Sequence, residues 1–163
     1  MITVRRAERK DFDLIWPLLQ PVFSAGDTYA VDPLITKNEA QALWMDQAVA
    51  TYVAEAHGQI VGTYYIKTNQ QGGGAHVCNC GYIVSAPARG QGIAARLCLH
   101  SQEEARALGY RAMQFNFVLA SNAGAVRLWH NLGFCTVGTI PDAFDHPALG
   151  FVDALVMHKT LTT

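Results

Sequence analysis

The stretch of this sequence best suited to binding chemistry is a turn with two glycines, Arg89-Gly90-Gln91-Gly92-Ile93-Ala94, between an apolar segment and a helical one. Glycine lets the main chain approach a ligand because no Cβ stands in the way. The first amides of a helix have no partner inside the helix, and with the helix dipole they form a site for anions such as pyrophosphate. An ordinary strand-to-helix turn would leave the same pattern. On this stretch alone the two interpretations are equally favoured.

Two other phosphate-binding patterns do not fit this turn. A Walker A loop ends in Gly-Lys-Ser/Thr, whereas here Gly92 is followed by Ile93 and Ala94. A dinucleotide fingerprint needs a third Gly or Ala at fixed spacing inside a strand–helix–strand unit, but this turn follows a predicted three-strand meander. A phosphate site here would therefore belong to a different class.

The cysteines nearby indicate packing rather than a metal or redox site. Cys78 and Cys80 are two residues apart on a predicted strand, so both side chains leave the same face. A zinc site would need two further ligands, and no second closely spaced pair of Cys or His completes one. Free cysteine is common in protein cores, so we expect buried thiols and no metal.

Asn79 and Asn116 stand among apolar neighbours in two predicted central strands. Asparagine is unfavourable in strands and costly to bury without hydrogen bonds, so both side chains need partners. We predict that the two amides serve a site, where an amide can orient an amine, hold a water molecule or donate to developing negative charge. The alternative is that they only satisfy neighbouring backbone groups.

The elements that position these residues follow from hydrophobic periodicity and turn residues. Helices are predicted over 11–23, 36–46, 93–108 and 122–132, and strands over 2–6, 51–56, 60–67, 76–84, 112–118, 134–140 and 151–159. Pro17 and Pro21 should kink or break the first helix. The order β-α-α-β-β-β-α-β-α-β-β predicts an α+β fold around one mixed sheet.

Length and composition predict one folded domain over residues 1–163, since 163 residues with 50% apolar side chains can bury a sizeable core. The formal charge of -1 gives no electrostatic reason to expect nucleic acid or an anionic membrane as partner. The N-terminal segment is charged and has no apolar signal core, and no apolar run is long enough to cross a membrane. We expect a cytoplasmic protein.

Two motifs make the sequence resemble the Gcn5-related N-acetyltransferases (GNAT). The turn from Arg89 to Ala94 is similar to that family's acetyl-CoA loop, Arg/Gln-x-x-Gly-x-Gly/Ala. The segment from Asn122 to Phe134 is similar to its Asn-x-x-Ala-x-x-Leu-Tyr-x-x-x-Gly-Phe motif. The order and spacing of the predicted elements match the family over essentially the whole chain. The resemblance implies the GNAT fold, a single mixed and mostly antiparallel sheet flanked by helices.

The resemblance also implies that the chain binds acetyl-CoA as cosubstrate. The amides of the turn would hold the pyrophosphate, and the strand ending at Val84 would splay from its neighbour and pair with the pantetheine arm. Asn122 would hydrogen-bond the arm or the region of the sulfur. The residues expected to contact the cofactor are Ile83, Val84, Arg89, Gly90, Gln91, Gly92, Ile93, Ala94, Asn122 and Trp129.

The sequence departs from the family where acid and base groups are concerned. The family's tyrosine, often the acid that protonates the leaving thiolate, is Trp129 here, and indole is no proton source near neutral pH. Many members place a glutamate on the strand before the loop, but residues 76–84 hold no carboxylate. Asn79, Asn116 and Asn122 resemble the asparagines of enzymes that acetylate proline analogues such as azetidine-2-carboxylate, which implies that Asn79 and Asn116 are catalytic.

The expected activity is direct acetyl transfer from acetyl-CoA, in a ternary complex, to the amine of a small molecule such as an amino acid or proline analogue. Asp27, Thr28 and Tyr29 are candidates for acceptor binding, because this fold usually closes a loop there, although they could be plain turn residues. The alternatives are an acetyl-CoA sensor without turnover and an enzyme that acetylates protein N-termini or lysines. A homodimer is a further expectation.

Overall fold

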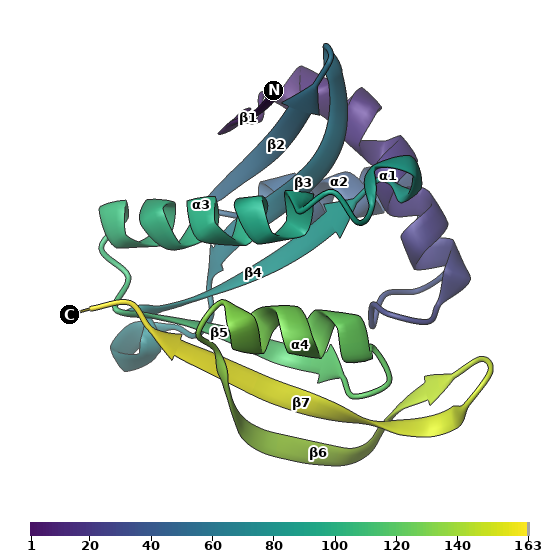
Figure 1. Cartoon of the computed structure of the whole chain (residues 1–163), viewed down its shortest axis with the longest axis vertical. Coiled ribbons are helices and arrows are strands. Elements are labelled where there is room, and N and C mark those ends of the chain that lie inside the picture. The colour runs from purple at the N-terminus through teal and green to yellow at the C-terminus, as the bar shows by residue number, and fades with distance from the viewer. Residues whose placement is uncertain (163) are drawn as a thin grey trace.

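The protein is built on one seven-stranded sheet, in a computed structural model that describes residues 1–162 (Figure 1). The strands are β1 (Ile2–Arg6), β2 (Ala50–Ala56), β3 (Gln59–Thr68), β4 (Val77–Val84), β5 (Ala112–Leu119), β6 (Cys135–His146) and β7 (Gly150–Thr160). Their order across the sheet is β1-β2-β3-β4-β5-β7-β6. Only β4 and β5 pair in parallel, and the other neighbours are antiparallel. The predicted mixed, mostly antiparallel sheet is confirmed.

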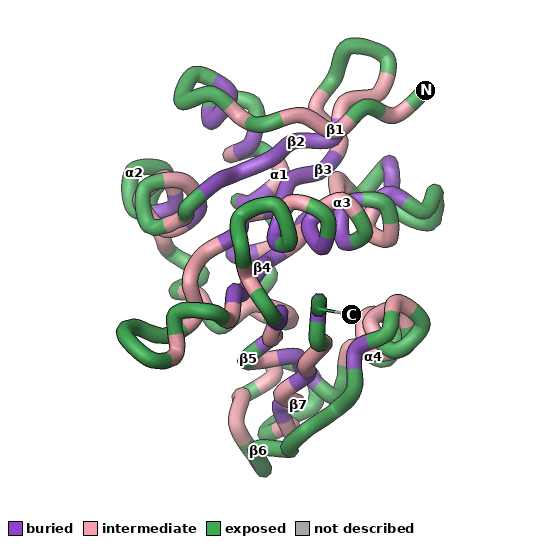
Figure 2. The backbone as a smooth tube through the Cα atoms, turned by 90° about the vertical axis from the view of Figure 1, so that its left-hand side faces the viewer, coloured by how far each residue is buried: buried purple, intermediate pink, exposed green. Residues whose placement is uncertain are grey.

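Helices cover both faces of this sheet and make two hydrophobic clusters. α1 (Phe12–Ala25) and α2 (Lys37–Gln41) pack on one face, around Ile15, Phe23 and Trp44. α3 (Ile93–Ala107) and α4 (Ala123–Asn131) pack on the other, where Leu97 of α3 is fully buried. Figure 2 shows the buried backbone concentrated in the central strands and along the inner side of α3. The helices therefore flank a single sheet, in the order that the sequence predicts.

The first helix is not broken, although Pro17 and Pro21 lie inside it. Both prolines are on the exposed side of α1, four residues apart. The backbone carbonyls that lose their helical donors therefore face solvent, where water can replace the missing bond. The opposite side carries Ile15, Leu19 and Phe23, which are buried. Burial of this apolar side outweighs the cost of two prolines, so the prediction of a break is wrong.

The hairpin of β6 and β7 is longer than the sequence predicts. β6 extends from Cys135 to His146, so Asp145 and His146 belong to the strand, and only residues 147–149 connect it to β7. Pro141 and Asp142 have the appearance of a turn in the sequence. They lie instead at an irregularity in the pairing with β7, between Ile140 and Phe144, on the outer strand of the sheet. Proline is tolerated there because its missing N–H faces no partner strand.

An ionic cluster ties β1 to the start of α1. The guanidinium of Arg5 binds both carboxylate oxygens of Asp11 (2.8 and 3.1 Å) and one oxygen of Glu55 on β2 (2.7 Å). Asp11 also accepts a bond from the backbone N–H of Glu8 (2.7 Å) and is buried. The hydrogen bonds from Arg5 hold the pKa of Asp11 below its ordinary value. Asp11 is therefore charged in the folded protein at neutral pH.

Replacing Asp11 with asparagine should lower the free energy of unfolding by about 2 kcal/mol at pH 7, because charge-assisted bonds to a buried carboxylate are lost. The lowered pKa means that this stabilisation is complete above the ordinary pKa of aspartate, about pH 4, and disappears as pH falls further. Urea unfolding at several pH values measures both effects. Asp13→Asn is the matched control, since Asp13 makes only an exposed pair with Lys37. Equal losses in the two variants would contradict the role of Asp11.

No helix within residues 1–162 is both long and apolar enough to span a lipid bilayer.

Candidate active site

The sheet opens between β4 and β5. The two strands pair only at Val77–Ala112 and Cys78–Met113, and beyond these pairs they diverge (Figure 1). The widening space between them, which we call the wedge, is flanked by α3 and α4 on one face of the sheet and by α1 on the other. A parallel pair that ends after two residues leaves backbone groups on both strands without a partner strand.

Alternate residues of β4 turn their backbone groups into the wedge. The carbonyl of Val77 accepts from Asn69, and the amide of Ser85 donates to Val61 (2.9 Å each), so odd-numbered residues face β3. Because successive residues point to opposite sides, the even-numbered residues face β5. Within the described part of the chain, no strand pairs with Cys80, Tyr82 or Val84 on that side. This edge can pair with an extended ligand.

This alternation separates two of the residues predicted to contact a cofactor. Val84 offers its backbone to the wedge. Ile83 directs its backbone to Thr63 of β3 and buries its side chain with α1. A ligand in the wedge would therefore meet Val84 directly and Ile83 only through the strand that it supports.

The glycine turn lies at the open end of the wedge and joins β4 to α3. Gly90 and Gly92 have φ values of 77° and 76°, the left-handed region that side chains disfavour. A Cβ at either position would meet nothing within 4 Å, so the backbone is open to a ligand. The first bond of α3 runs from the Arg96 amide to the Gly92 carbonyl (3.1 Å), which leaves the amides of residues 93–95 outside the helical ladder. These features fit a pyrophosphate.

The structure has two notable surface hollows. One, of about 180 Å³, adjoins the glycine turn, with Arg89 and Val84 on one side and Pro17 and Pro21 of α1 on the other. The larger one, of about 430 Å³, lies between β1 and α3 and is lined by residues that include Thr3, Leu99 and Glu103. The second hollow is on the far side of α3 from the wedge and contains none of the predicted site residues.

Helix α4 follows β5, with Asn122 at its N-terminal cap and Trp129 in its last turn. Asn122 caps the helix, because its side-chain oxygen accepts from the amide of Ala125 (3.3 Å). The side-chain nitrogen of Asn122 donates to no group within residues 1–162, so it is available for a ligand. The indole of Trp129 packs against the rings of Tyr82 and Phe115, with centroids 5.1 Å away in both cases. Because Tyr82 lies on β4 and Phe115 on β5, Trp129 forms one wall of the wedge.

Replacing Trp129 with phenylalanine should therefore leave kcat within about tenfold of the original, because the variant keeps an aromatic wall and removes no acid. Steady-state kinetics at saturating acetyl-CoA measure the change. Circular dichroism and the affinity for CoA confirm that the variant is folded. A loss of more than about a hundredfold in kcat would give the indole N–H a chemical role.

Asn79 is buried and bridges the narrow end of the wedge. Its side-chain nitrogen donates to the backbone carbonyl of Gln114 on β5 (2.9 Å), one residue beyond the last backbone pair. Its oxygen accepts from the hydroxyl of Tyr65 on β3 (3.3 Å). Within the described chain, one N–H and one lone pair of the Asn79 side-chain amide have no further partner. Asn79 thus holds the two strands at the point where they part, and it still presents hydrogen-bonding capacity there.

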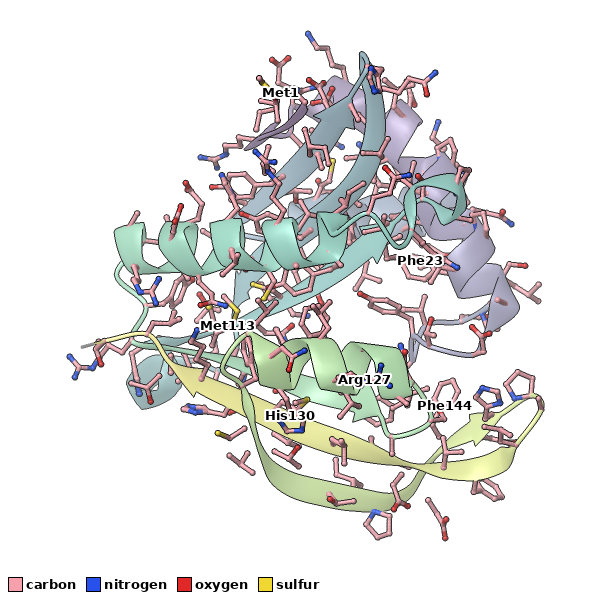
Figure 3. The ribbon with its side chains drawn as sticks, viewed as in Figure 1. Met1, Phe23, Met113, Arg127, His130 and Phe144 are labelled. Carbon is pink, nitrogen blue, oxygen red and sulfur yellow. The ribbon has the colours of Figure 1, made fainter. Side chains whose placement is uncertain are left out.

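Asn116 lies on the same face of the sheet as Asn79 but is exposed. Met113 and Phe115 of β5 face α3 and α4 (Met113 is labelled in Figure 3), so Gln114 and Asn116 face the α1 side. The side-chain nitrogen of Gln114 donates to the oxygen of Asn116 (3.0 Å). The nitrogen of Asn116 donates in turn to the oxygen of Asn69 (2.6 Å). The structure thus places both predicted asparagines on one face, though in separate hydrogen-bond groups.

The loop after α1 contributes Tyr29 to this face. The Tyr29 hydroxyl donates to the carbonyl of Tyr82 (2.9 Å), one of the wedge-facing groups of β4. Its ring packs against Phe23 and Trp44, and burial raises the pKa of the phenol, which stays protonated. Of the other two loop residues predicted to bind an acceptor, Asp27 is exposed and Thr28 is half-buried.

The sequence did not reveal three residues of this face, Tyr65, Lys67 and Gln114. Tyr65 stands over Gly81, where an added Cβ would come within 2.7 Å of the ring. The ammonium of Lys67 lies 5.3 Å from the centroid of the Tyr65 ring. The alternation of β3 puts both on one face, but only the register with β4 shows that this face is the one with Asn79.

The cysteines next to the wedge are buried, as predicted. Cys78, Cys80 and Cys98 belong to the core, and burial raises the pKa of the Cys80 and Cys98 thiols, which disfavours the nucleophilic thiolate. Cys135 is different, since it is exposed at the start of β6. Among residues 1–162, no group of three or more His, Cys, Asp or Glu side chains is placed to hold a metal ion.

Comparison with known proteins agrees with this geometry. Residues 12–134 match the Acetyltransferase (GNAT) family. The chain is 31% identical over 150 residues to N-acetyltransferase aca1 of Schizosaccharomyces pombe, covering 80% of this chain and 71% of that protein.

Solved structures are similar over almost the whole chain. A GCN5-related N-acetyltransferase from Kribbella flavida has 42% sequence identity and a TM-score of 0.92, covering 98% of this chain and 97% of that one. A phosphinothricin acetyltransferase from Sinorhizobium meliloti, solved in complex with AcCoA, has a TM-score of 0.87 over 98% of this chain and 88% of that one, and at 19% identity it shares the fold. This chain is a member of the acetyltransferase (GNAT) family.

Proposed function

We propose that residues 1–163 act as one domain that transfers an acetyl group directly from acetyl-CoA to the amine of a small molecule, with both substrates bound at once. The observation that carries this proposal is the wedge. The backbone edge at Cys80, Tyr82 and Val84 runs toward the open amides of the glycine turn. An elongated ligand with an anionic end fits such a path. A polar face lies on the opposite side of the same opening.

The residues on the α3 side would hold the cosubstrate, which supplies an acetyl thioester when bound. The amides of residues 90–95 would bind its pyrophosphate, and Arg89 would add a positive charge beside them. The wedge edge of β4 would pair with the extended arm. Asn122 would donate from its free side-chain N–H, and Trp129 would pack along the arm.

The residues on the α1 side would receive the acceptor. The polar side chains of this face near the wedge include Tyr65, Lys67, Asn69, Asn79, Gln114 and Asn116, with His158 of β7 opposite Gln114, and none of these is a carboxylate. Burial raises the pKa of Tyr65 to about 12, so its hydroxyl is not a base near neutral pH. These groups would orient an amine that has already lost its proton to water, and the core thiols would take no part in the transfer.

The experiment is a panel of acceptors with acetyl-CoA, followed by free thiol release and by mass spectrometry of the acceptor. The panel contains amino acids, azetidine-2-carboxylate, simple amines, and peptides with free N-termini or lysines. We expect equal amounts of free CoA and acetylated small molecule. Acetylation of the peptides alone would favour a protein acetyltransferase. Tight acetyl-CoA binding without thiol release, for every acceptor, would favour a sensor.

We place this activity in the cytoplasm and propose a homodimer formed along β6. This outer strand is exposed over most of its length, with Val137 62% and Ile140 42% accessible, and Cys135–Ile140 carries no charge. An uncovered apolar edge strand tends to pair with a strand of another chain. The β6 strand of a second copy would pair with the free backbone groups of this β6. Light scattering should show a dimer for the unchanged protein and a monomer for Val137→Lys. Leu34→Lys, at an exposed loop residue, is the control, and monomers throughout would contradict the dimer.

A further inference from the structure

Lys67 carries a positive charge on the acceptor face. In the register of β3 and β4, Lys67 lies directly opposite Asn79. Opposite residues of an antiparallel pair extend their side chains on the same face of the sheet. The Lys67 ammonium lies 5.3 Å from the centroid of the Tyr65 ring, and the Tyr65 hydroxyl donates to Asn79. The charge is thus held over the aromatic ring that is hydrogen-bonded to the narrow end of the wedge.

This charge has no carboxylate partner within residues 1–162. The salt bridges of the described chain join other residues, in the Arg5 cluster and at Arg9, Lys10 and Lys37. Lys67 is half-buried, and the side chains beyond it on this face include the amides of Asn69, Asn116 and Gln114. An ammonium with amide N–H donors nearby and no competing acid is suited to a ligand's carboxylate.

The separation between Lys67 and the wedge suits a small acceptor. Lys67 is on β3, and the wedge opens on the far side of β4, so the two are one to two strand spacings apart, roughly 5–10 Å. A lysine side chain and an α-amino acid together can span this distance. With the carboxylate at Lys67, the amine would reach Asn79 and the β4 edge, where the acetyl group would be presented.

We propose that Lys67 binds the carboxylate of the acceptor and so makes the enzyme selective for amino acids over amines that lack an acid group. This inference rests on the proposed function, since it names the substrate class of the same site. Lys67 is a specificity-determining residue in this account, and it moves no proton.

The test compares each amino acid with its own carboxamide, using L-azetidine-2-carboxylate and L-alanine. The carboxamide keeps size and amine but loses the charge. For the unchanged protein, kcat/KM should be higher for the acid. Lys67→Met keeps most of the side-chain stem and should lower kcat/KM for the acid by about 10- to 100-fold, chiefly through KM, as expected for a lost charge-assisted bond. The same variant should change kcat/KM for the carboxamide by less than about threefold. Lys67→Arg should retain the preference for the acid.

Two further measurements keep the result interpretable. Lys37→Met is the matched control, because Lys37 makes an exposed ion pair with Asp13 away from this face. This variant should leave kcat/KM unchanged for both the acid and the carboxamide. Calorimetry of the CoA-loaded protein with each acid and carboxamide measures the same preference without turnover. It therefore tests Lys67 even if the protein transfers no acetyl group.

The outcomes separate this inference from the proposed function. If Lys67→Met lowers kcat/KM equally for the acid and the carboxamide, Lys67 only supports Tyr65. If kcat/KM for the acid does not fall, the carboxylate of the acid binds elsewhere. Either result overturns the inference while acetyl transfer to amines stands. If no amine is acetylated by the unchanged protein, the proposed function fails. Calorimetry then tests the role of Lys67 independently, because it shows whether the CoA-loaded protein binds acids more tightly than carboxamides.

Discussion

Replacing Gly92 with glutamate is expected to weaken acetyl-CoA binding by about a thousandfold, the largest effect of any single substitution in this account. The new carboxylate would stand at the first turn of α3, beside the amides of residues 93–95 that we assign to the pyrophosphate. Two like charges 4 Å apart near a protein surface repel by about 4 kcal/mol, which corresponds to roughly three orders of magnitude in Kd. Isothermal calorimetry with acetyl-CoA measures the change directly.

Gly109 provides a matched control at the opposite end of α3. Gly109 also has a positive φ, 89°, and an added Cβ there would meet nothing within 4 Å. Gly109→Glu therefore introduces the same charge and similar backbone strain, about 1–2 kcal/mol, without reaching the turn. It should bind acetyl-CoA as the unchanged protein does. Unaltered affinity in a folded Gly92→Glu variant would show that the glycine turn is an ordinary strand-to-helix connection.

The second large effect is expected on the acceptor side. Asn79→Ala and Asn116→Ala should each lower kcat/KM for the acceptor by about a hundredfold, the typical loss when one positioned hydrogen-bond donor is removed. The Kd for acetyl-CoA should change much less, because the groups assigned to the pyrophosphate and the arm lie elsewhere. Asn122→Ala should show the opposite pattern, with weaker cosubstrate binding. Initial rates and calorimetry on the same preparations separate the two patterns.

Stability distinguishes the two acceptor-side asparagines. Asn79→Ala leaves the Gln114 carbonyl and the Tyr65 hydroxyl without their partner, so the free energy of unfolding should fall by about 1–3 kcal/mol. Asn116 is exposed, so its replacement should cost less than about 0.5 kcal/mol. Asn38→Ala, on the exposed side of α2, should alter neither rate nor stability. If Asn79→Ala and Asn116→Ala instead weaken acetyl-CoA binding as much as Asn122→Ala does, the asparagines only support the cosubstrate strand.

The parts of the site that are local in sequence could be predicted. The glycine turn, the cap at Asn122 and the helix after it depend on residues within one or two turns of each other, and the structure shows them with positive φ at Gly92 and a capping bond at Ala125. The order of the elements along the chain needed only their lengths and periodicities, whereas the place of β7 between β5 and β6 in the sheet did not follow from them. The capping box at Thr36 and Glu39, which opens α2, is likewise local in sequence.

The parts that depend on register could not be predicted. Asn79 was identified as a polar residue that needs partners, but those partners are Tyr65 and the backbone of Gln114, which are distant in the chain. Nothing local to Lys67 shows that it lies opposite Asn79. The turn at residues 72–74 does not fix the register of β3 and β4, which could shift by one residue. The bond from Tyr29 to Tyr82 joins an irregular loop to a strand, and no periodicity describes it.

Helix α1 and strand β6 were misjudged for a related reason. The sequence shows only which residues flank a proline. The energetic cost of that proline depends on whether the backbone groups that lose a hydrogen bond point to solvent or into the protein. In α1 they point to solvent, and in β6 they lie on the outer edge of the sheet. Tertiary context decided both cases.

Amide hydrogen exchange with and without acetyl-CoA shows whether the wedge between β4 and β5 receives the cosubstrate. Acetyl-CoA should protect the amides of Cys80, Tyr82 and Val84 and those of residues 90–95, while the amides that line the larger hollow between β1 and α3 stay unchanged. Protection at β1 and the middle of α3, with the wedge edge and the glycine turn still exchanging freely, would contradict binding in the wedge.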